Sequence, residues 1–214
     1  MARCENEAMN NRFKILVLGI SAIVAVITYI NPVFPREQFL QQAGTILLVA
    51  VLLADLRKHW FSNLAFAGIA LFMMLHLVGA RYIYSYVPYQ EWLQGLGDWE
   101  WLHTTRNHYD RLVHLLFGVL LFPALVEFSQ RRVTSRQVMA VMVAWLMVQA
   151  GSLIYELFEW ALTLVLSPED AEGYNGQQGD LWDAHKDMAL AMLGSTIAAG
   201  YYIVRIILNR GACK

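Results

Sequence analysis

Residues 179–194 read GDLWDAHKDMALAMLG and lead from a polar stretch into the last apolar segment of the chain. Asp183 and Asp187 are four residues apart, so in a helix that begins near Trp182 they project from one face, one turn apart. Carboxylates at the boundary of a membrane segment are costly unless a metal ion, an arginine, a histidine or a proton compensates them. They therefore mark a functional site, and the rest of the chain is expected to supply the partner.

The composition is that of a membrane protein. Apolar and aromatic residues make up 57% of the 214 residues and charged residues only 15%, and the apolar residues lie in blocks. This pattern predicts one polytopic membrane domain over 1–214 rather than a soluble protein. Cys4 and Cys213 lie near opposite ends, which disfavours a disulfide framework. The apolar run 15–30 is followed by no cleavage pattern, so we interpret it as a retained first helix.

The apolar blocks predict an all-α bundle of six transmembrane helices. Their ranges are about 14–30, 38–54, 61–82, 110–128, 138–166 and 182–207. Prolines 32 and 35 make a turn after the first helix, and polar loops at 87–109 and 167–181 precede the fourth and the sixth. The loop 87–109 holds Trp92, Trp99 and Trp101, which we expect to anchor it at the membrane surface.

The distribution of basic residues predicts the orientation. With the N-terminus inside, all but five of the 16 Lys and Arg residues fall at cytoplasmic ends and turns, the exceptions being Arg36, Arg81, Arg106, Arg111 and Lys186. Both termini are therefore expected in the cytoplasm. All but four of the 17 acidic residues fall in the opposite half. Acidic residues orient helices weakly, so we attribute their asymmetry to chemistry.

Polar residues from four of the predicted helices fall at one depth, just below the outer surface. These are His76, Arg81, Asp110, Arg111, His114, Glu156, Glu159, Asp183 and Asp187. His103, His108 and His185 also fall in the outer half of the predicted bundle, whereas His59 does not. The i, i+4 spacing of Asp110 and His114 and the i, i+3 spacing of Glu156 and Glu159 place each pair on one helix face.

An imidazole with several carboxylates is a mixed nitrogen and oxygen donor set that suits magnesium, manganese, iron or zinc. We expect a divalent metal ion held by Asp110, His114, Glu156, Asp183 and Asp187. Glu159 or His108 is then the expected general base, with Arg111 as a third functional group. The helices that begin at 110 and 182 point their amide ends toward this layer, and with Arg106 and Arg111 they favour an anionic lipid head group there.

A structural interpretation of the same residues remains open. Arg81, Arg106 or Arg111 would then pair with the acids as buried bridges that fix helix register. His114 would be a hydrogen-bonding group within the membrane. Glu127 is expected to pair with the basic turn at Arg131 and Arg132, at the other end of the bundle.

The last three helices carry a family resemblance. The motifs are Asp110 to His114 followed by Phe117 and Gly118, the pair Glu156 and Glu159, and Asp183 to Asp187 with Gly194. In these the chain resembles the VanZ-like membrane proteins, and more closely the YjdF-type proteins of the bacterial inner membrane, a family without a characterised function. The resemblance implies a multi-pass protein of the inner membrane. Glu159 and Asp187 stand where the VanZ-like pattern has amides, which favours a bound cation or proton here.

Three functions fit these features. The preferred one is a metal-dependent membrane enzyme, a hydrolase or transferase, acting on a lipid or lipid-linked substrate at the outer face. A proton- or cation-coupled transporter is the second, although no internal repeat is present and the cluster lies near one surface. A non-catalytic scaffold is the third. The basic residues form a topological belt, so no nucleic-acid partner is expected.

Overall fold

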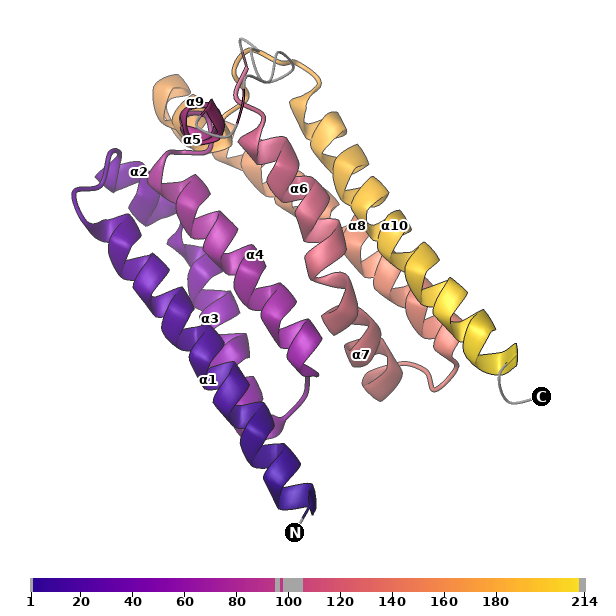
Figure 1. The fold of residues 1–214 in the computed structure, drawn as a ribbon. Helices are drawn as coiled ribbons and strands as arrows, with labels where there is room; N and C mark the ends of the chain where they lie inside the picture. The colour runs from indigo at the N-terminus through magenta and orange to yellow at the C-terminus, as the bar shows by residue number, and fades with distance from the viewer. Residues whose placement is uncertain (1, 95–96, 98–105, 212–214) are drawn as a thin grey trace.

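The computed structural model describes residues 2–94, 97 and 106–211, and within these ranges the chain is all-α. In chain order the helices are α1 (Ala2–Tyr29), α2 (Pro35–Leu40), α3 (Gln42–Lys58), α4 (Asn63–Arg81), α5 (Tyr89–Gln94), α6 (Tyr109–Leu120), α7 (Phe122–Arg132), α8 (Gln137–Thr163), α9 (Pro168–Asn175) and α10 (Asp183–Gly211). They form one elongated bundle in which α1 begins and α10 ends at the same end (Figure 1).

Five helical segments of the described chain are long and apolar enough to cross a membrane. They are Asn11–Tyr29, Asn63–Arg81, Tyr109–Arg132, Gln137–Thr163 and Asp183–Arg210. The predicted all-α membrane class is therefore confirmed. The sixth predicted segment, 38–54, appears as α3, whose 17 residues lie at the lower limit of the ~20 that a bilayer core needs.

The structure also differs from the prediction in the connections. Pro35 was expected in a turn, but it opens the short helix α2, where its missing amide hydrogen costs nothing at the first helical turn. The polar stretch 167–181 contains α9, which Ser167 caps by accepting a hydrogen bond from the Asp170 amide. The fourth predicted helix is broken at Leu121 into α6 and α7, because the Pro123 ring is incompatible with a continuous helix there.

Two glycines let α6 and α10 pack backbone to backbone. A Cβ atom at Gly118 would overlap the Ala191 carbonyl oxygen, and one at Gly194 would overlap the Leu115 carbonyl oxygen. Small residues at such a crossing allow the close approach on which membrane helices depend. Gly118 lies one turn after His114, so the side chains above the crossing are held against α10.

A buried ion pair joins the first helices at the other end of the bundle. Lys14 Nζ of α1 lies 2.6 Å from Asp55 Oδ2 of α3, and both side chains are almost completely buried. Lys14 also donates to the Phe61 carbonyl oxygen, and Asp55 accepts from the Phe61 amide. Each charge is thus paired and hydrogen-bonded, as a buried charge must be.

Glu127 has a different partner from the predicted one. The sequence predicted a pair with the turn at Arg131 and Arg132, whereas in the structure Glu127 accepts a hydrogen bond from the Ser62 amide.

Candidate metal site

Helices α6 and α10 bring three potential metal ligands together. Asp110, His114 and Asp187 each offer one ligand atom, and these atoms lie within 4.8 Å of one another. Asp110 and His114 share a face of α6, and Asp187 lies two turns before Gly194 on the face of α10 that packs against α6. The glycine crossing therefore determines how far apart the two helices hold these ligands.

The separations suit ligands of a shared ion better than direct hydrogen bonds. His114 Nε2 lies 3.6 Å from Asp110 Oδ1 and 3.7 Å from Glu156 Oε1 of α8, beyond the usual 2.7–3.2 Å of a hydrogen bond. Ligands bonded at about 2.0–2.6 Å to one hard cation lie roughly 3 to 5 Å apart. Glu156 Oε1 and Asp187 Oδ1 are buried and have no hydrogen-bond partner among the described residues. These two oxygens point to a ligand.

Asp183, the fifth expected ligand, is paired differently. Its Oδ1 forms an ion pair with Arg106 Nη2 and lies 3.7 Å from Arg111 Nη2. Arg111 also pairs with Asp180, whose Oδ2 lies 2.6 Å from Nζ of the third cation, Lys186. The arginine bridges that the structural interpretation predicted are thus present at the rim, on Asp183 and Asp180. Within the described part of the chain, no arginine bridge forms on Asp110 or Asp187.

Asp180 anchors this rim outside the membrane-spanning helices. The hydrogen bond from Lys186, followed by the one from the Trp182 amide, lowers the pKa of the Asp180 carboxyl to about 2. The carboxylate is therefore ionised at any physiological pH. It holds the loop before α10 against Arg111, which itself stands on α6 one residue after Asp110.

The expected general bases lie on two sides of the cluster. Glu159 follows Glu156 by three residues on α8, and its carboxyl group lies beside the Tyr155 hydroxyl. Asn175 Nδ2 of α9 donates a hydrogen bond to the backbone carbonyl oxygen of Glu159. His108 precedes α6, and burial followed by the charges of Arg111 and Arg106 lowers the pKa of its imidazole. His108 is therefore predominantly neutral near pH 7, as a general base must be.

Other residues of the predicted polar layer do not join the cluster. Arg81 donates to the carbonyl oxygens at the end of α1, including those of Thr28 and Ile30. His185 is exposed and packs on the edge of Trp182. His103, Trp99 and Trp101 lie outside the described residues. The polar layer is thus a mixture of site residues and helix caps.

Sequence reasoning missed a polar chain beside the site. Tyr84 Oη lies 2.5 Å from His76 Nδ1, and His76 Nε2 lies 3.0 Å from the Gln41 carbonyl oxygen. Because a carbonyl only accepts, Nε2 carries the proton and Nδ1 accepts from the tyrosine. Burial, followed by the charge of Asp110, raises the pKa of the Tyr84 hydroxyl well above its usual value.

An apolar cavity of about 310 Å³ adjoins the cluster, with Asp110, His114, Tyr84 and His76 in its wall. The rest of the wall comes mainly from apolar residues of α3, α4, α6 and α8. This combination of an apolar chamber with a few convergent polar groups is typical of a ligand site. The cluster therefore faces a space that a molecule can occupy.

Comparison with known proteins gives the same class. Residues 13–207 match the protein family DUF2238, described as a predicted membrane protein. The chain is 33% identical over 195 residues to the inner membrane protein YjdF of Escherichia coli (strain K12). The aligned region covers 87% of this chain and 89% of that relative. No solved structure matches the chain. The YjdF-type resemblance and the location in the inner membrane are confirmed, whereas the VanZ-like resemblance stays a prediction.

Proposed function

Since the chain belongs to the DUF2238 family of predicted membrane proteins, we propose that it is a metal-dependent membrane enzyme acting on a lipid or lipid-linked substrate. The observation that carries the proposal is the meeting of Asp110, His114 and Asp187 within 4.8 Å. Glu156 Oε1 and Asp187 Oδ1, which have no hydrogen-bond partner among the described residues, belong to the same cluster of side chains. Buried acids of this kind are expensive unless a cation compensates them.

The proposed topology has six crossings, with both termini in the cytoplasm and the site near the extracytoplasmic face. Two observations support it. Helices α2 and α3 together run over residues 35–58, which is long enough for the sixth crossing. The end of the bundle where α1 begins and α10 ends also carries most of the basic residues.

In this proposal Asp110, His114, Glu156 and Asp187 hold the ion. Asp183 contributes less directly to metal binding, because its Oδ1 is paired with Arg106 and Arg111. When bound, a divalent ion supplies a Lewis acid that polarises a carbonyl or phosphoryl oxygen of the substrate.

The remaining residues position the substrate and move a proton. Glu159 lies one helical turn from Glu156 and is the proposed general base, with neutral His108 as the other candidate. Arg111 is held by Asp180 at the rim, where its charge favours an anionic head group. Tyr84 borders the cavity with its hydroxyl hydrogen directed to His76, which keeps that hydroxyl in a fixed orientation.

Metal analysis of the purified protein tests the proposal. We expect wild-type protein to carry a divalent ion, and His114→Ala and Asp187→Asn to lose it. His185→Ala and Asp170→Asn are the matched controls, because His185 is exposed and Asp170 forms a surface pair with Arg36. Equal and negligible metal in every sample would refute the enzyme proposed here and favour a proton-coupled or structural role for the acids.

A further inference from the structure

The cavity beside the cluster has a polar end and an apolar end. Asp110, His114 and Tyr84 line one end, at the start of α6, and Phe117 and Leu121 line the other. Asp110 and Leu121 are eleven residues apart, so the cavity extends for roughly 16 Å along the helix axis. That is about half of the ~30 Å hydrocarbon core of a bilayer. The cavity thus matches the depth of one lipid leaflet.

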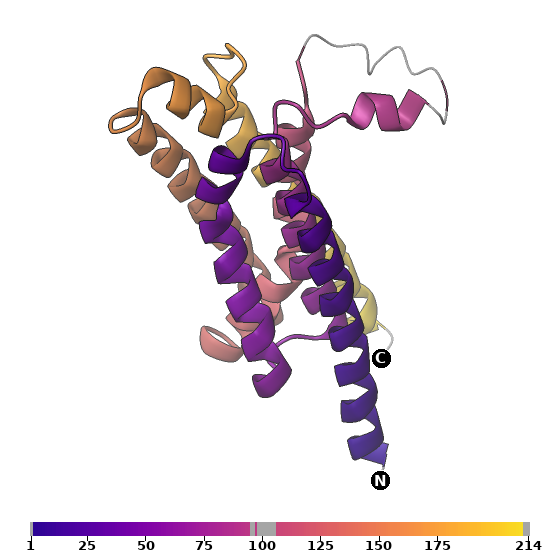
Figure 2. The same ribbon diagram turned by 90° about the vertical axis from the view of Figure 1, so that its left-hand side faces the viewer.

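The cavity opens sideways, between α3 and α8. Leu47 of α3 and Tyr155 of α8 line it, yet they are 65% and 37% exposed. Residues that both line a cavity and face the surroundings mark its mouth. In Figure 2 the upper part of α8 lies to the left of α3, and its lower part passes behind α3. In the proposed six-crossing topology both helices lie in the membrane, so the mouth faces lipid chains.

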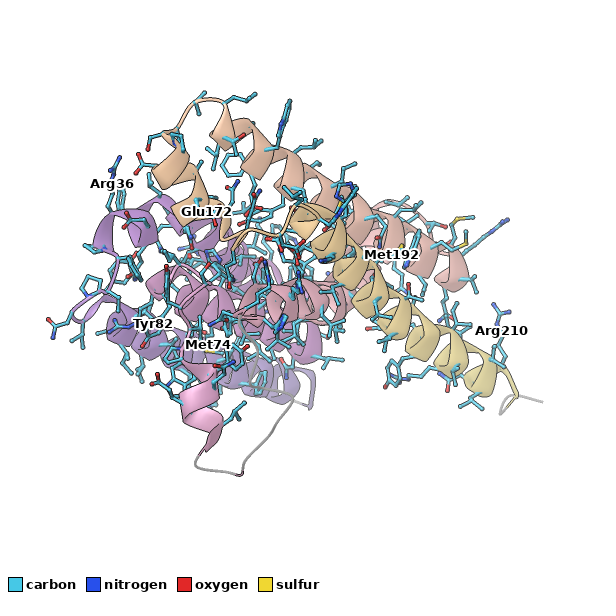
Figure 3. All side chains as sticks on the ribbon, turned by 90° about the horizontal axis from the view of Figure 1, so that it is seen from above. Arg36, Met74, Tyr82, Glu172, Met192 and Arg210 are labelled. Carbon is cyan, nitrogen blue, oxygen red and sulfur yellow. The ribbon has the colours of Figure 1, made fainter. Side chains whose placement is uncertain are left out.

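The outer end of this flank is covered. Helices α2 and α9 meet there through an ion pair in which Arg36 Nη1 lies 3.2 Å from Asp170 Oδ1. Figure 3, seen from above, shows Arg36 of α2 and Glu172 of α9 on the same side of the molecule. With the outer end covered, the lateral mouth is the favoured route for an apolar molecule.

We propose that the cavity binds one hydrocarbon chain of a membrane lipid, which enters between α3 and α8 and places its polar head at Asp110 and His114. This inference rests on the proposed function and specifies its substrate as an amphiphile with a chain lying parallel to α6. The apolar walls solvate the chain. Phe72 of α4 and Phe117 of α6, whose ring centroids are 5.6 Å apart, pack against each other and form part of the wall along which the chain lies.

Photo-crosslinking tests the inference. The protein is reconstituted into vesicles of phosphatidylethanolamine and phosphatidylglycerol, with some phosphatidylglycerol carrying a diazirine at the end of one acyl chain. Peptide mass spectrometry then locates the label. We expect labelling of Phe72 and Phe117 above that of Ile197, which is 58% exposed on α10 and lines no part of the cavity.

Two variants close the cavity in different ways. Leu47→Trp covers the mouth without disturbing the core, and Leu53→Trp is its control, since Leu53 is 52% exposed on the same helix and does not line the cavity. Gly151→Leu fills the interior, because a Cβ atom there would already lie 3.2 Å from Phe117 Cζ. We expect both closing variants to lose the label at Phe72, and Leu53→Trp to keep it.

The outcomes separate this inference from the proposed function. Label at Phe72 and Phe117 no stronger than at Ile197 in wild-type protein overturns the chain site, whatever the metal content. Label that survives Leu47→Trp and Gly151→Leu in folded protein overturns it as well. Strong, variant-sensitive labelling of a protein without metal supports the chain site and refutes the metal-dependent chemistry alone.

Discussion

The substitution Gly118→Ala provides a test of the crossing that sets the ligand distances. A Cβ atom at this position would lie 2.6 Å from the Ser195 nitrogen and would overlap the Ala191 carbonyl oxygen. Both are backbone atoms of α10 and cannot rotate away. Carbon atoms ordinarily lie about 3.3–3.6 Å from such oxygens, so α6 and α10 must separate by roughly 1 Å.

That separation acts directly on the metal site. Asp110 and His114 move with α6 and Asp187 with α10, and a metal site tolerates deviations of only about 0.2 Å in its bond lengths. We expect Mn²⁺ affinity to fall about 10–100-fold, comparable with the loss of a supporting group. Overpacking should also cost about 1–3 kcal/mol of stability.

Calorimetric titration of Mn²⁺ into the purified protein measures the first effect, and thermal unfolding measures the second. Gly200→Ala is the matched control, because a Cβ atom there meets nothing within 4 Å. It should bind Mn²⁺ as wild type does and unfold at the same temperature or slightly higher. A folded Gly118→Ala protein with wild-type affinity would refute the role of the crossing.

Three further substitutions test parts of the structure that surround the site. Asp180→Asn should lower the thermal midpoint of unfolding by a constant amount from pH 8 to about pH 4. Because the pKa of Asp180 is about 2 in the folded protein and about 3.9 in the unfolded chain, this deficit should disappear as the pH falls toward 2. A deficit that vanishes near pH 6 would contradict this. Tyr84→Phe leaves a partly buried imidazole nitrogen of His76 without its donor and should cost about 1–3 kcal/mol in chemical unfolding, whereas the exposed Tyr86→Phe should cost nothing measurable. Lys14→Met strands the buried Asp55 carboxylate and should cost about 3–5 kcal/mol; adding Asp55→Leu should restore part of that stability, and no recovery would show that the pair is not the cause.

The sequence predicted the helices well because hydropathy and proline positions act locally. The last predicted helix began at Trp182, and α10 begins at Asp183. The break at Leu121 was missed although Pro123 signals it, since the apolar run continues through the proline. The helix α9 was missed because its eight residues carry little apolar character, and only the cap at Ser167 indicates it.

The sequence predicted that acidic and histidine side chains gather near one end of the bundle, but not how they pair. Helical spacing places Asp183 and Asp187 on one face, and it cannot decide which of them meets an arginine. That depends on the path of the chain before α6, which brings Arg106 to Asp183. Tyr84 reaches His76 because Ile83 and Tyr84 adopt positive φ angles of 43° and 57° after α4. Neither is a residue type that favours this conformation, so the turn has no signal in the sequence.

Electron spin echo spectroscopy of the Mn²⁺-loaded protein tests most directly whether an ion is bound between α6 and α10. We expect a nitrogen coupling from a single coordinated imidazole, which His114→Ala abolishes and His185→Ala leaves unchanged. Bound Mn²⁺ without a nitrogen coupling, or with one that survives His114→Ala, would contradict the site described here.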